Sequence, residues 1–446
     1  MEQQVFPGSK SEQLLKELQE YVIVEPYPFV VDLKQSRAME LATLDGQRLT
    51  DWTGLYGSKL LGYNHPTMFE PEYLETLAYA SATKLPNPDF LTPECLAYYR
   101  LLYKIAPKCM KNPQLEVYAV NSGAEAVENM MKYFINVHRK RALKRQESPG
   151  PARFLYFDQA FHGRTVFALN ITKLEHDPVI TKDFQGMVPG NLKVPFPAWN
   201  NSMTDGDNRK VLHSALATLE YVMDQYGSEI AGVILEPIQG AGGHRVAHGD
   251  FYSTLSKLCY DHQVLWGLDE VQTAGGQCGE VFAIDCFPIP HAPNAVASAK
   301  KLANGVIYML DPMEDVGVLD STWGGTLSDM VRFTQEWKIV EQENLLAQVP
   351  QKTQALVQGL QSLEAKYPGT ITNVRGLGLY QGFSFINPKL SGKAVDLALE
   401  QEHLLLLGAG PGTVRLRPPL DVTLQDIQIF LEKLERVLIS LTQVTG

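Results

Sequence analysis

The sequence is short of the features that mark several large classes of protein. Its five cysteines are scattered, without the paired spacing of a disulfide framework or a zinc ribbon, so we expect reduced thiols and no metal site. It has no run of about 18 apolar residues, so we expect no membrane-spanning helix. Acidic residues outnumber basic ones, and the net charge of -11 argues against nucleic acid or an anionic membrane as a partner.

The first residues also lack the marks of a targeting segment. Met1 to Val5 carry neither the basic and apolar stretches of a secretory signal nor the arginine-rich, acid-poor character of a mitochondrial transit peptide. We therefore expect a cytoplasmic protein. Because the whole molecule is acidic, an anionic substrate must be bound by individual arginine side chains rather than attracted by the overall field.

What the sequence does have is enough length and apolar content for more than one domain. Its 446 residues, of which 45% are apolar, suit about two or three domains. Apolar runs typical of strands alternate with stretches of helical periodicity, the runs at 115–120, 153–157, 232–235 and 264–268 and the helices at 126–144 and 211–226. This alternation predicts an α/β fold with a mostly parallel sheet covered by helices on both faces.

The two ends of the chain predict a second, smaller α+β unit. A long helix is expected at 327–348, followed by a helix, strands within 371–385, another helix, a strand at 412–417 and a last helix at 424–441. A hairpin around Asp45-Gly46 is too short to form its own core, and residues 54–66 predict an irregular loop near a site. We expect residues 1–66 and 336–446 to form the smaller domain and residues 67–335 the larger one.

Two stretches carry the strongest chemical signal. Asp269 follows the strand-like run 264–268, and Lys300 follows a run of apolar and small residues. Ligands of open α/β sheets bind at the carboxyl ends of the strands. An acid and a lysine there suit pyridoxal phosphate, because lysine binds the aldehyde as a Schiff base and aspartate keeps the ring nitrogen protonated. Taken singly, such an aspartate is more often a cap, and the pair Lys300-Lys301 more often lies on the surface.

Further motifs surround this pair. Ser122, Gly123 and Ala124 join a predicted strand to a helix, where small residues let backbone N–H groups approach a phosphate. Phe161 and Arg164 lie in one short segment, so an aromatic ring could stack on a planar group while the arginine binds a carboxylate. Each motif alone also fits a tight turn, a core aromatic or a surface arginine.

Three more segments add to this set. Glu236 ends a strand-like run before a glycine-rich turn. The hydroxyls of Ser321 and Thr322 precede a helix, which again favours phosphate. Arg415 alternates with Arg417, which predicts that both lie on one face of a strand.

Taken together and in this order, the motifs resemble those of the class III pyridoxal-phosphate aminotransferases of fold type I, from about residue 45 onward. Within that class the chain is similar to the L-lysine 6-aminotransferases and the 4-aminobutyrate aminotransferases, and segments 321–332 and 414–420 are closest to the former. The resemblance implies a large domain with a mostly parallel, seven-stranded type of sheet and a smaller α+β domain from both termini. It also implies a homodimer with active sites at the interface.

The resemblance also implies roles for individual residues. Lys300, rather than Lys301, is expected to form the Schiff base, while Asp269 pairs the ring nitrogen of the cofactor. The other expected cofactor contacts are Ser122, Gly123, Ala124, Phe161 on the ring, Glu236, Gln272 at the phenolic oxygen and, from the second subunit, Thr322. The expected substrate contacts are Arg164, Arg415, Asp320 and Ser321.

The reaction implied is transfer of a terminal amino group, first of all the ε-amine of L-lysine, to 2-oxoglutarate, giving the semialdehyde and glutamate. The chain departs from the family pattern at Ala241, where relatives have glutamate, and at Asp320, where the lysine enzymes have asparagine. Ala241 also fits a broader ω-amine or ω-amino-acid transaminase that is 4-aminobutyrate-like or uses pyruvate. An aminomutase, or a catalytically idle relative with a binding role, would fit the same fold.

Overall fold

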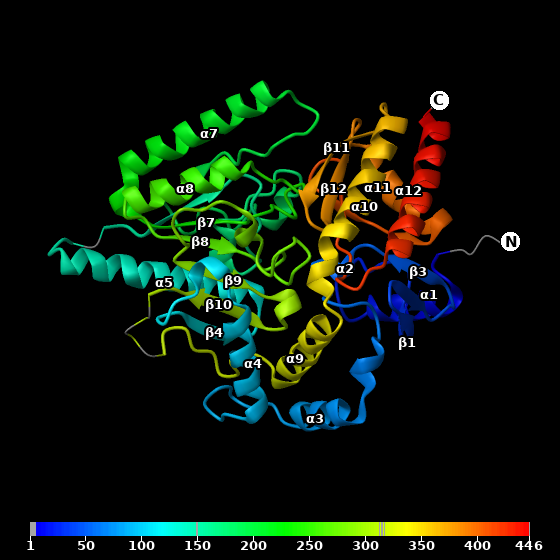
Figure 1. Ribbon diagram of the computed structural model, residues 1–446, viewed down its shortest axis with the longest axis horizontal. Coiled ribbons are helices and arrows are strands. Elements are labelled where there is room, and N and C mark those ends of the chain that lie inside the picture. The colour runs from blue at the N-terminus through cyan, green and yellow to red at the C-terminus, as the bar shows by residue number, and fades with distance from the viewer. Residues whose placement is uncertain (1–5, 149, 312, 314, 316, 446) are drawn as a thin grey trace.

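The computed structural model describes residues 6–148, 150–311, 313, 315 and 317–445, so the expectation placed on residues 1–5 lies outside the described residues. Figure 1 shows a larger body on the left, built from the middle of the chain in cyan to yellow-green. Beside it lies a smaller body that contains both ends of the chain, in blue and in orange to red.

Within the described residues, seven strands form the central sheet of the larger body, in the order β4-β10-β9-β8-β7-β5-β6. Among these described strands β10 (Gly305–Met309) runs opposite to the rest and pairs antiparallel with both β4 and β9. The parallel strands are β4 (Glu116–Val120), β5 (Arg153–Phe157), β6 (Leu192–Val194), β7 (Ile230–Leu235), β8 (Trp266–Asp269) and β9 (Ala295–Ser298). A mostly parallel sheet inside an α/β body confirms the predicted fold class.

Helices cover both faces of this sheet because successive side chains of each strand point to opposite sides. Phe154 and Tyr156 of β5 pack with α5 (Gly123–Lys144) in one apolar cluster. Leu155 and Phe157 pack in another cluster, which contains α7 (Asp205–Tyr226), α8 (Gly249–Asp261) and α4 (Pro93–Ile105). Thr92 caps α4, its Oγ1 accepting from Cys95 N at 3.2 Å, as the Thr-Pro pair predicts.

In the part of the smaller body that the structure describes there are two four-stranded sheets. The first has the order β1-β2-β3-β13, and its parallel pairing of Leu404 with Thr50 joins the two ends of the chain. Its strands are β1 (Val31–Arg37), β2 (Glu40–Thr43), β3 (Arg48–Asp51) and β13 (Leu404–Leu405). The predicted hairpin turn lies between β2 and β3, with Gly46 at φ +85°. The N-terminal segment thus pairs with the C-terminal part, as expected from its short length.

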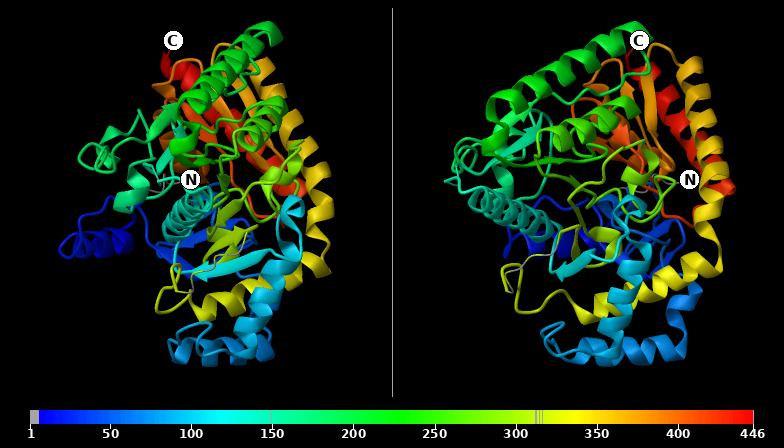
Figure 2. Two further views of the ribbon diagram at one scale, coloured as in Figure 1. Left: turned by 90° about the vertical axis from the view of Figure 1, so that its left-hand side faces the viewer. Right: turned by 60° about the vertical axis from the view of Figure 1, so that its left-hand side comes forward.

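The second sheet lies under the C-terminal helices. Its strands, in order, are β11 (Ile371–Leu377), β12 (Tyr380–Phe385), β15 (Thr413–Arg415) and β14 (Leu407–Ala409). Figure 2 shows α10 (Leu345–Lys366) and α12 (Leu424–Thr445), gold and red, running side by side at this end of the molecule. The remaining helices are α1 (Ser9–Leu18), the short turn α2 (Gly54–Gly57), α3 (Pro71–Ala82), α6 (Val166–Leu169) and α11 (Leu390–Glu402).

The single long helix predicted at 327–348 is wrong. The chain forms α9 (Leu327–Gln342) and α10, separated at Asn344, which adopts φ +51°. Asparagine is one of the few side chains that tolerate this left-handed conformation, because its short amide can bond locally. The predicted domain boundary after residue 335 falls within α9, which packs on α3 and α4. We propose that the smaller domain begins at α10.

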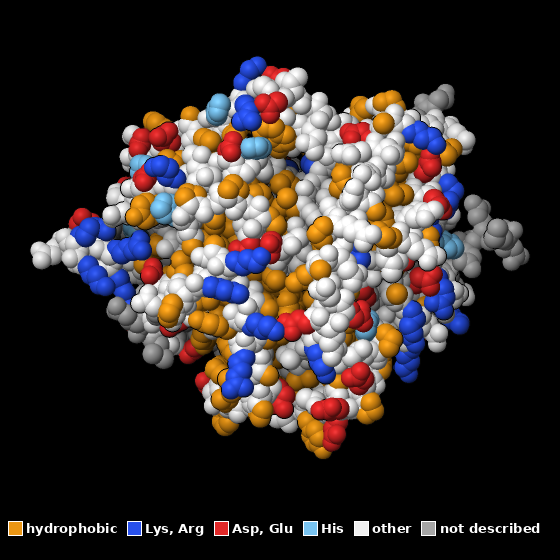
Figure 3. Space-filling view, viewed as in Figure 1, with side chains coloured by type: hydrophobic (Ala, Val, Ile, Leu, Met, Phe, Trp, Pro, Cys, Tyr) orange, Lys and Arg blue, Asp and Glu red, His pale blue; other side chains and the backbone are white. Residues whose placement is uncertain are grey.

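The surface and the helices bear on possible partners. In Figure 3 basic and acidic side chains are interspersed over the face shown, and Lys and Arg gather at the left edge, where α5 ends. No helix within the described residues is long and apolar enough to cross a membrane. The same residues contain no group of three or more His, Cys, Asp or Glu side chains placed to hold a metal ion.

Candidate active site

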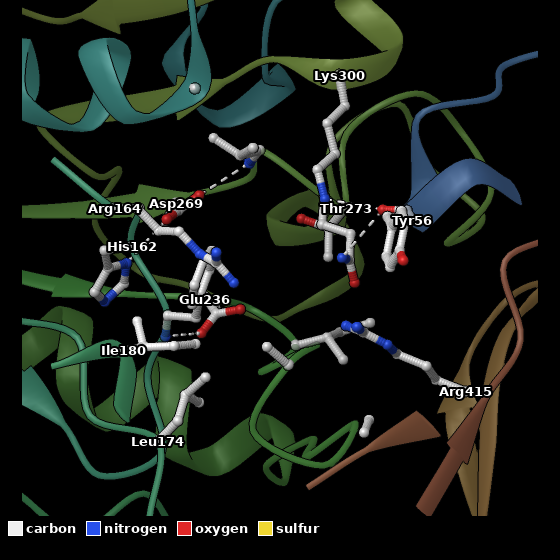
Figure 4. A pocket seen from close by; sticks show the side chains of 18 of the residues that line it. Tyr56, His162, Arg164, Leu174, Ile180, Glu236, Asp269, Thr273, Lys300 and Arg415 are labelled. Carbon is white, nitrogen blue, oxygen red and sulfur yellow. Dashed lines mark hydrogen bonds and ion pairs between the residues drawn. The ribbon is translucent and has the colours of Figure 1, made fainter. Parts of the chain in front are cut away.

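A cavity of about 720 Å³ lies at the carboxyl ends of the central strands, between the larger and smaller bodies. Asp269 ends β8, Lys300 follows β9, and Glu236 follows β7. Arg415 reaches the same cavity from β15 of the smaller body (Figure 4). The cavity therefore brings together charged groups from both bodies at the edge where parallel sheets bind ligands.

Asp269 is held in one orientation by two contacts. Its side chain accepts a hydrogen bond from Val271 N at 3.0 Å, and His162 Nδ1 lies 2.9 Å from the other carboxylate oxygen. Because a carboxylate only accepts, this geometry places the imidazole proton on Nδ1. Both side chains are buried, and Thr172 Oγ1 accepts from the backbone N–H of His162 at 2.9 Å. The sequence reasoning missed His162, although it adjoins Phe161 in the motif already singled out.

Lys300 lies on the cavity wall in a strained backbone conformation, with φ +49°. Its Nζ donates to the backbone oxygen of Tyr56 at 2.9 Å. Burial, followed by the positive charge of Arg415, lowers the pKa of Lys300 to about 8. Lys301 points away from the cavity and is fully buried, with Nζ 2.7 Å from Tyr380 Oη. Of the two lysines, only Lys300 can reach a molecule in this cavity.

Ser122, Gly123 and Ala124 line the cavity at the N-terminus of α5. Ser122 Oγ accepts from Glu125 N at 3.2 Å and so caps the helix. A Cβ at Gly123 would lie 2.8 Å from Val271 Cγ1, and one at Gly305 would lie 2.1 Å from Ser122 O. The close packing lets the backbone approach a ligand, and the positive end of a long helix favours a phosphate there.

Glu236 and Phe161 are linked in the cavity wall. Glu236 Oε1 accepts from Phe161 N at 2.9 Å, and Oε2 accepts from Gly240 N at 3.1 Å. Burial raises the pKa of Glu236 to about 7. The carboxyl group therefore fixes the aromatic segment and the glycine-rich turn against each other, while its oxygens border the cavity.

Gln272 also lines the cavity, but its carboxamide oxygen is already engaged. Arg417, which is fully buried, donates to this oxygen from Nε at 3.1 Å and from Nη2 at 3.0 Å. The amide nitrogen lies 3.4 Å from Tyr56 O. Only the NH2 group of Gln272 is thus placed to serve an oxygen acceptor on a bound ligand.

Arg415 has a buried guanidinium group with free donors. It is 8% exposed, and its Nε and Nη1 have no hydrogen-bond partner among the described residues. Burial, followed by the nearby charge of Arg417, lowers the pKa of Arg415 to about 9. A Cβ at Gly240 would lie 3.3 Å from Nη1, so the Gly240-Ala241 turn adjoins the guanidinium without supplying a side-chain acceptor. An unpaired buried cation of this kind is a site for a carboxylate.

Arg164 approaches the cavity from the other side. Its side chain is exposed to the cavity, and Figure 4 shows it near Asp269 and Glu236, opposite Arg415. The two arginines of the sequence prediction therefore lie on one cavity, at different ends of it. Two separate anionic groups could be bound at once.

Three predicted residues lie outside the cavity of this chain: among the described lining residues, Asp320, Ser321 and Thr322 are absent. Asp320 accepts from the hydroxyl of Tyr118, and Ser321 Oγ accepts from Asn121 Nδ2 at 3.0 Å. These contacts place the segment beside the start of α5 but on its outer side. The structure of one chain does not bring it to Lys300.

The residues that do meet fit pyridoxal phosphate. The small residues at the N-terminus of α5 suit its phosphate, and Lys300 offers an amine of lowered pKa. Asp269, fixed by His162, offers a carboxylate at the bottom of the cavity. The NH2 group of Gln272, whose contact with Tyr56 O is long at 3.4 Å, lines the cavity and can donate to an oxygen of the cofactor.

Comparison with known proteins places the chain in a family. The profile of the family described as Aminotransferase class-III matches residues 22–438. The chain is 30% identical to the L-lysine-epsilon aminotransferase of Mycobacterium tuberculosis over 420 residues, covering 91% of each chain. It is 26% identical to the mitochondrial 4-aminobutyrate aminotransferase of Rattus norvegicus, covering 95% of this chain and 88% of the relative.

Solved structures agree with this. The lysine aminotransferase from Mycobacterium tuberculosis matches with a TM-score of 0.89 at 27% identity, covering 96% of this chain and 99% of that one. An acetylornithine aminotransferase from Elizabethkingia anophelis, at 21% identity and a TM-score of 0.72, shares the fold. Because the family profile spans nearly the whole length and the cavity suits the cofactor, the chain belongs to the class III aminotransferases, pyridoxal-phosphate-dependent enzymes that pass an amino group from an amine donor to a keto acid.

Proposed function

We propose that the enzyme transfers the ε-amino group of L-lysine to 2-oxoglutarate, giving the semialdehyde and glutamate. The observation that carries this proposal is the pair of arginines at opposite ends of one cavity, of which Arg415 is buried and unpaired. The L-lysine-epsilon aminotransferases among the relatives support the choice of donor.

The two substrates need different cations. Lysine must present its ε-amine to the cofactor, so its α-carboxylate lies at the far end of the cavity, where we place Arg164. 2-Oxoglutarate carries a carboxylate next to its reacting carbonyl, which we assign to Arg415, and its second carboxylate then extends to Arg164. Bidentate pairing with arginine suits both substrates.

In this assignment the residues of the chain have separate roles. When bound, pyridoxal phosphate supplies a protonated ring that withdraws electrons from the carbon bearing the amine. Asp269 holds the proton on the ring nitrogen, because an adjacent carboxylate favours the cationic form. Lys300 Nζ, whose pKa near 8 leaves part of it neutral at physiological pH, would take the proton from the amine-bearing carbon of the substrate and deliver it to the aldehyde carbon of the cofactor. His162 keeps the Asp269 carboxylate in place.

The cofactor contacts follow from the same assignment. We place the phosphate at Ser122, Gly123 and Ala124, and the ring against Phe161. Gln272 then meets the phenolic oxygen through its NH2 group, since Arg417 occupies its oxygen. Glu236 supports the ring segment through its bond to Phe161 N.

We further propose a homodimer in which Asp320, Ser321 and Thr322 complete the site of the partner subunit. Their position outside this chain's cavity supports this assignment. Exposed apolar side chains lie in the adjoining segments, among them Phe90, Leu91 and Trp323. Asn87 N donates to Trp323 O at 3.1 Å, so these segments form one surface. Such a surface favours burial against another chain.

A reducing compartment, the cytoplasm, is the proposed location. Its support is that all five cysteines are free thiols in the structure. Burial also raises the pKa of Cys259 and Cys278, which keeps both thiols protonated and unreactive.

The broader ω-amine transaminase remains the second candidate, because the turn at Ala241 places no acid beside Arg415. A matrix of half-reactions separates the two. Purified holoenzyme is mixed with lysine, 4-aminobutyrate or a simple ω-amine, and the amine form of the cofactor is then offered 2-oxoglutarate or pyruvate. We expect lysine to convert the cofactor rapidly to its amine form and 2-oxoglutarate to convert it rapidly back to the aldehyde form. Preference for pyruvate, or no net transfer to either keto acid, would overturn the proposal.

The site assignment has its own test. Lys300→Ala should bind the cofactor and show no turnover, while its visible absorbance changes because the amine that binds the aldehyde is gone. Lys301→Ala is the comparison in the neighbouring position and should keep measurable turnover, because Lys301 does not line the cavity. If Lys300→Ala keeps normal activity and Lys301→Ala has none, the assignment is wrong by one residue.

A further inference from the structure

Residues 54–57, here called the 54–57 turn, form one left-handed turn beside the cavity. Their φ angles are +53° for Gly54, +50° for Leu55, +62° for Tyr56 and +77° for Gly57. Ser58 N donates to the oxygen of Gly54 at 2.8 Å and closes the turn. Leucine and tyrosine rarely adopt this conformation, because their Cβ atoms crowd the following carbonyl. The surroundings must therefore hold the turn in place.

The glycines at its two ends are required by close packing as well as by φ. A Cβ at Gly54 would lie 2.0 Å from Arg417 O, and one at Gly57 would lie 3.1 Å from Gln272 Cγ. On the side of the N-terminal strand, Asp51 Oδ1 accepts from Gly54 N at 3.1 Å. The turn is thus fixed between β3 and the residues that border the cavity.

Two consecutive lysines hold two consecutive carbonyl oxygens of this turn. Lys300 Nζ donates to Tyr56 O at 2.9 Å, and Lys301 Nζ donates to Gly57 O at 3.1 Å. Lys301 also donates to Gln272 O at 2.5 Å and is completely buried. Its single side chain therefore connects the turn to the segment that follows Asp269.

The contact with Tyr56 decides where the amine of Lys300 points. Among the described residues, Tyr56 O is the one hydrogen-bond partner that Lys300 Nζ has. A carbonyl oxygen only accepts, so it takes an N–H of the amine and leaves the lone pair of neutral Lys300 directed elsewhere. If the turn shifts, the amine loses its direction in the cavity.

We propose that Lys301 is a positioning residue for the reaction: by holding the Gly57 carbonyl, it fixes the left-handed turn that presents Tyr56 O to the free amine of Lys300. Lys301 does not touch the cavity and takes no part in proton transfer. The inference rests on the proposed catalytic role of Lys300. It adds that the second lysine of the pair serves the first through a strained backbone turn.

The test compares two buried lysines whose Nζ atoms donate to backbone carbonyls in different parts of the molecule. In Lys301→Met the apolar stem remains and the donors are lost. Lys352→Met is the matched control, because Lys352 is also buried and its Nζ donates to a carbonyl, Leu420 O at 2.8 Å, away from the cavity. Both variants are prepared as holoenzymes. Backbone hydrogen exchange of residues 57–59, cofactor affinity, kcat and KM are measured for each.

We expect exchange of residues 57–59 to become about tenfold faster in Lys301→Met and to stay unchanged in Lys352→Met. kcat should fall roughly 10- to 100-fold in Lys301→Met, the cost of a misplaced reacting group, while KM and cofactor affinity stay within about threefold. An equal fall of kcat in Lys352→Met would overturn the proposal, as would unchanged exchange in Lys301→Met. Should Lys301→Met fail to fold, Lys301→Gln, which keeps one donor group, takes its place.

A second substitution tests the route through the turn. Leu55 is 45% exposed, and glycine adopts its φ without strain, so Leu55→Gly should stabilise the turn. Added to Lys301→Met, it should restore kcat by about three- to fivefold and slow the exchange. If kcat does not recover, Lys301 does not act through this turn. The exchange measurement reports the backbone of the turn and not the chemistry, so an active Lys300→Ala would refute the catalytic assignment, whereas unchanged exchange in Lys301→Met would refute the hold on the turn.

Discussion

The two ends of the active-site cavity are built in opposite ways. At one end Asp269 has a partner for each of its oxygens, in Val271 N and His162 Nδ1. At the other end Arg415 is equally buried, yet two of its donor nitrogens have no partner among the described residues. Both groups carry charge, so burial alone does not explain the difference.

The difference reflects how long each ligand stays. A group that serves a resident cofactor can be fixed once, by hydrogen bonds that hold its ionised form. A group that binds a substrate carboxylate in every catalytic cycle would have to break any hydrogen bond to a protein partner each time. A guanidinium without such a partner therefore binds the carboxylate faster, although burying it unpaired is costly. The charge of Asp269 is thus compensated by hydrogen bonds within the protein. The charge of Arg415 is compensated when a substrate carboxylate binds.

Removing the fixed charge should have the largest effect. Asp269→Asn keeps the shape but cannot hold the proton on the ring nitrogen, so we expect kcat to fall on the order of 10³-fold, roughly 4 kcal/mol of transition-state stabilisation. Single-turnover absorbance measures this. Asp285→Asn, a half-buried carboxyl that binds Lys108 N and lies away from the cavity, is the control. A loss below tenfold with the cofactor still bound would remove this role from Asp269.

Removing the unpaired charge should affect one substrate more than the other. Arg415→Met should raise the KM for 2-oxoglutarate roughly 10- to 100-fold, the range of one charged hydrogen-bonded contact. Reduction of the cofactor by lysine should change only a few-fold. Arg164→Met should instead weaken the binding of both substrates. Steady-state kinetics for each substrate distinguish the two patterns, and equal effects of both variants on lysine would contradict the division of roles.

Supplying a partner should make the Arg415 end resemble the Asp269 end. Ala241→Glu places an acid on the turn beside Arg415 and should disfavour α-carboxylates there. We expect preference for lysine over glutamate as donor to rise by a few-fold to about a hundredfold. Ala241→Gln, of similar size but uncharged, is the control. Rapid-mixing measurements with each donor give the ratio, and an unchanged ratio would refute the idea.

The smallest expected effect is a shift in the titration of Lys300. In cofactor-free protein its neutral, reactive fraction should rise as the pH increases through about 8, because its pKa is lowered to about that value. Arg415→Met removes a positive neighbour, which favours the protonated amine, so the midpoint should move upward. Labelling with an amine-selective reagent, read at Lys300 by mass spectrometry, follows both curves. A midpoint near 10 in the unaltered protein would contradict the burial of this amine.

Much of the fold could be predicted because its signals are local. Apolar runs identify the buried strands that end at Val120, Leu235 and Asp269, and Thr92-Pro93 identifies the start of a helix. The break at Asn344 was missed, since the apolar periodicity continues through it and only a backbone angle reveals it. The resemblance supplied the choice of Lys300 over Lys301, which the residues alone did not decide.

The parts of the site that escaped prediction depend on contacts between distant segments. His162 and Asp269 lie 107 residues apart, and nothing near either residue marks the other as its partner. The turn at Leu55 and Tyr56 was expected only as an irregular loop, because neither side chain signals a left-handed conformation. Contacts from distant segments hold it, among them those of Asp51 with Gly54 N and of Lys300 and Lys301 with its carbonyl groups. Proximity in the fold, rather than any local pattern, creates these features.

The antiparallel strand β10 has a consequence for how this sequence can change over generations. Its first residue, Gly305, lies so close to Ser122 that a Cβ there would come within 2.1 Å of a backbone oxygen. Most surface positions of the chain can drift among many amino acids, but here every alternative pushes the strand away from the start of α5. Such a change would disturb the cofactor-binding junction, so lineages carrying it would lose the chemistry of the protein.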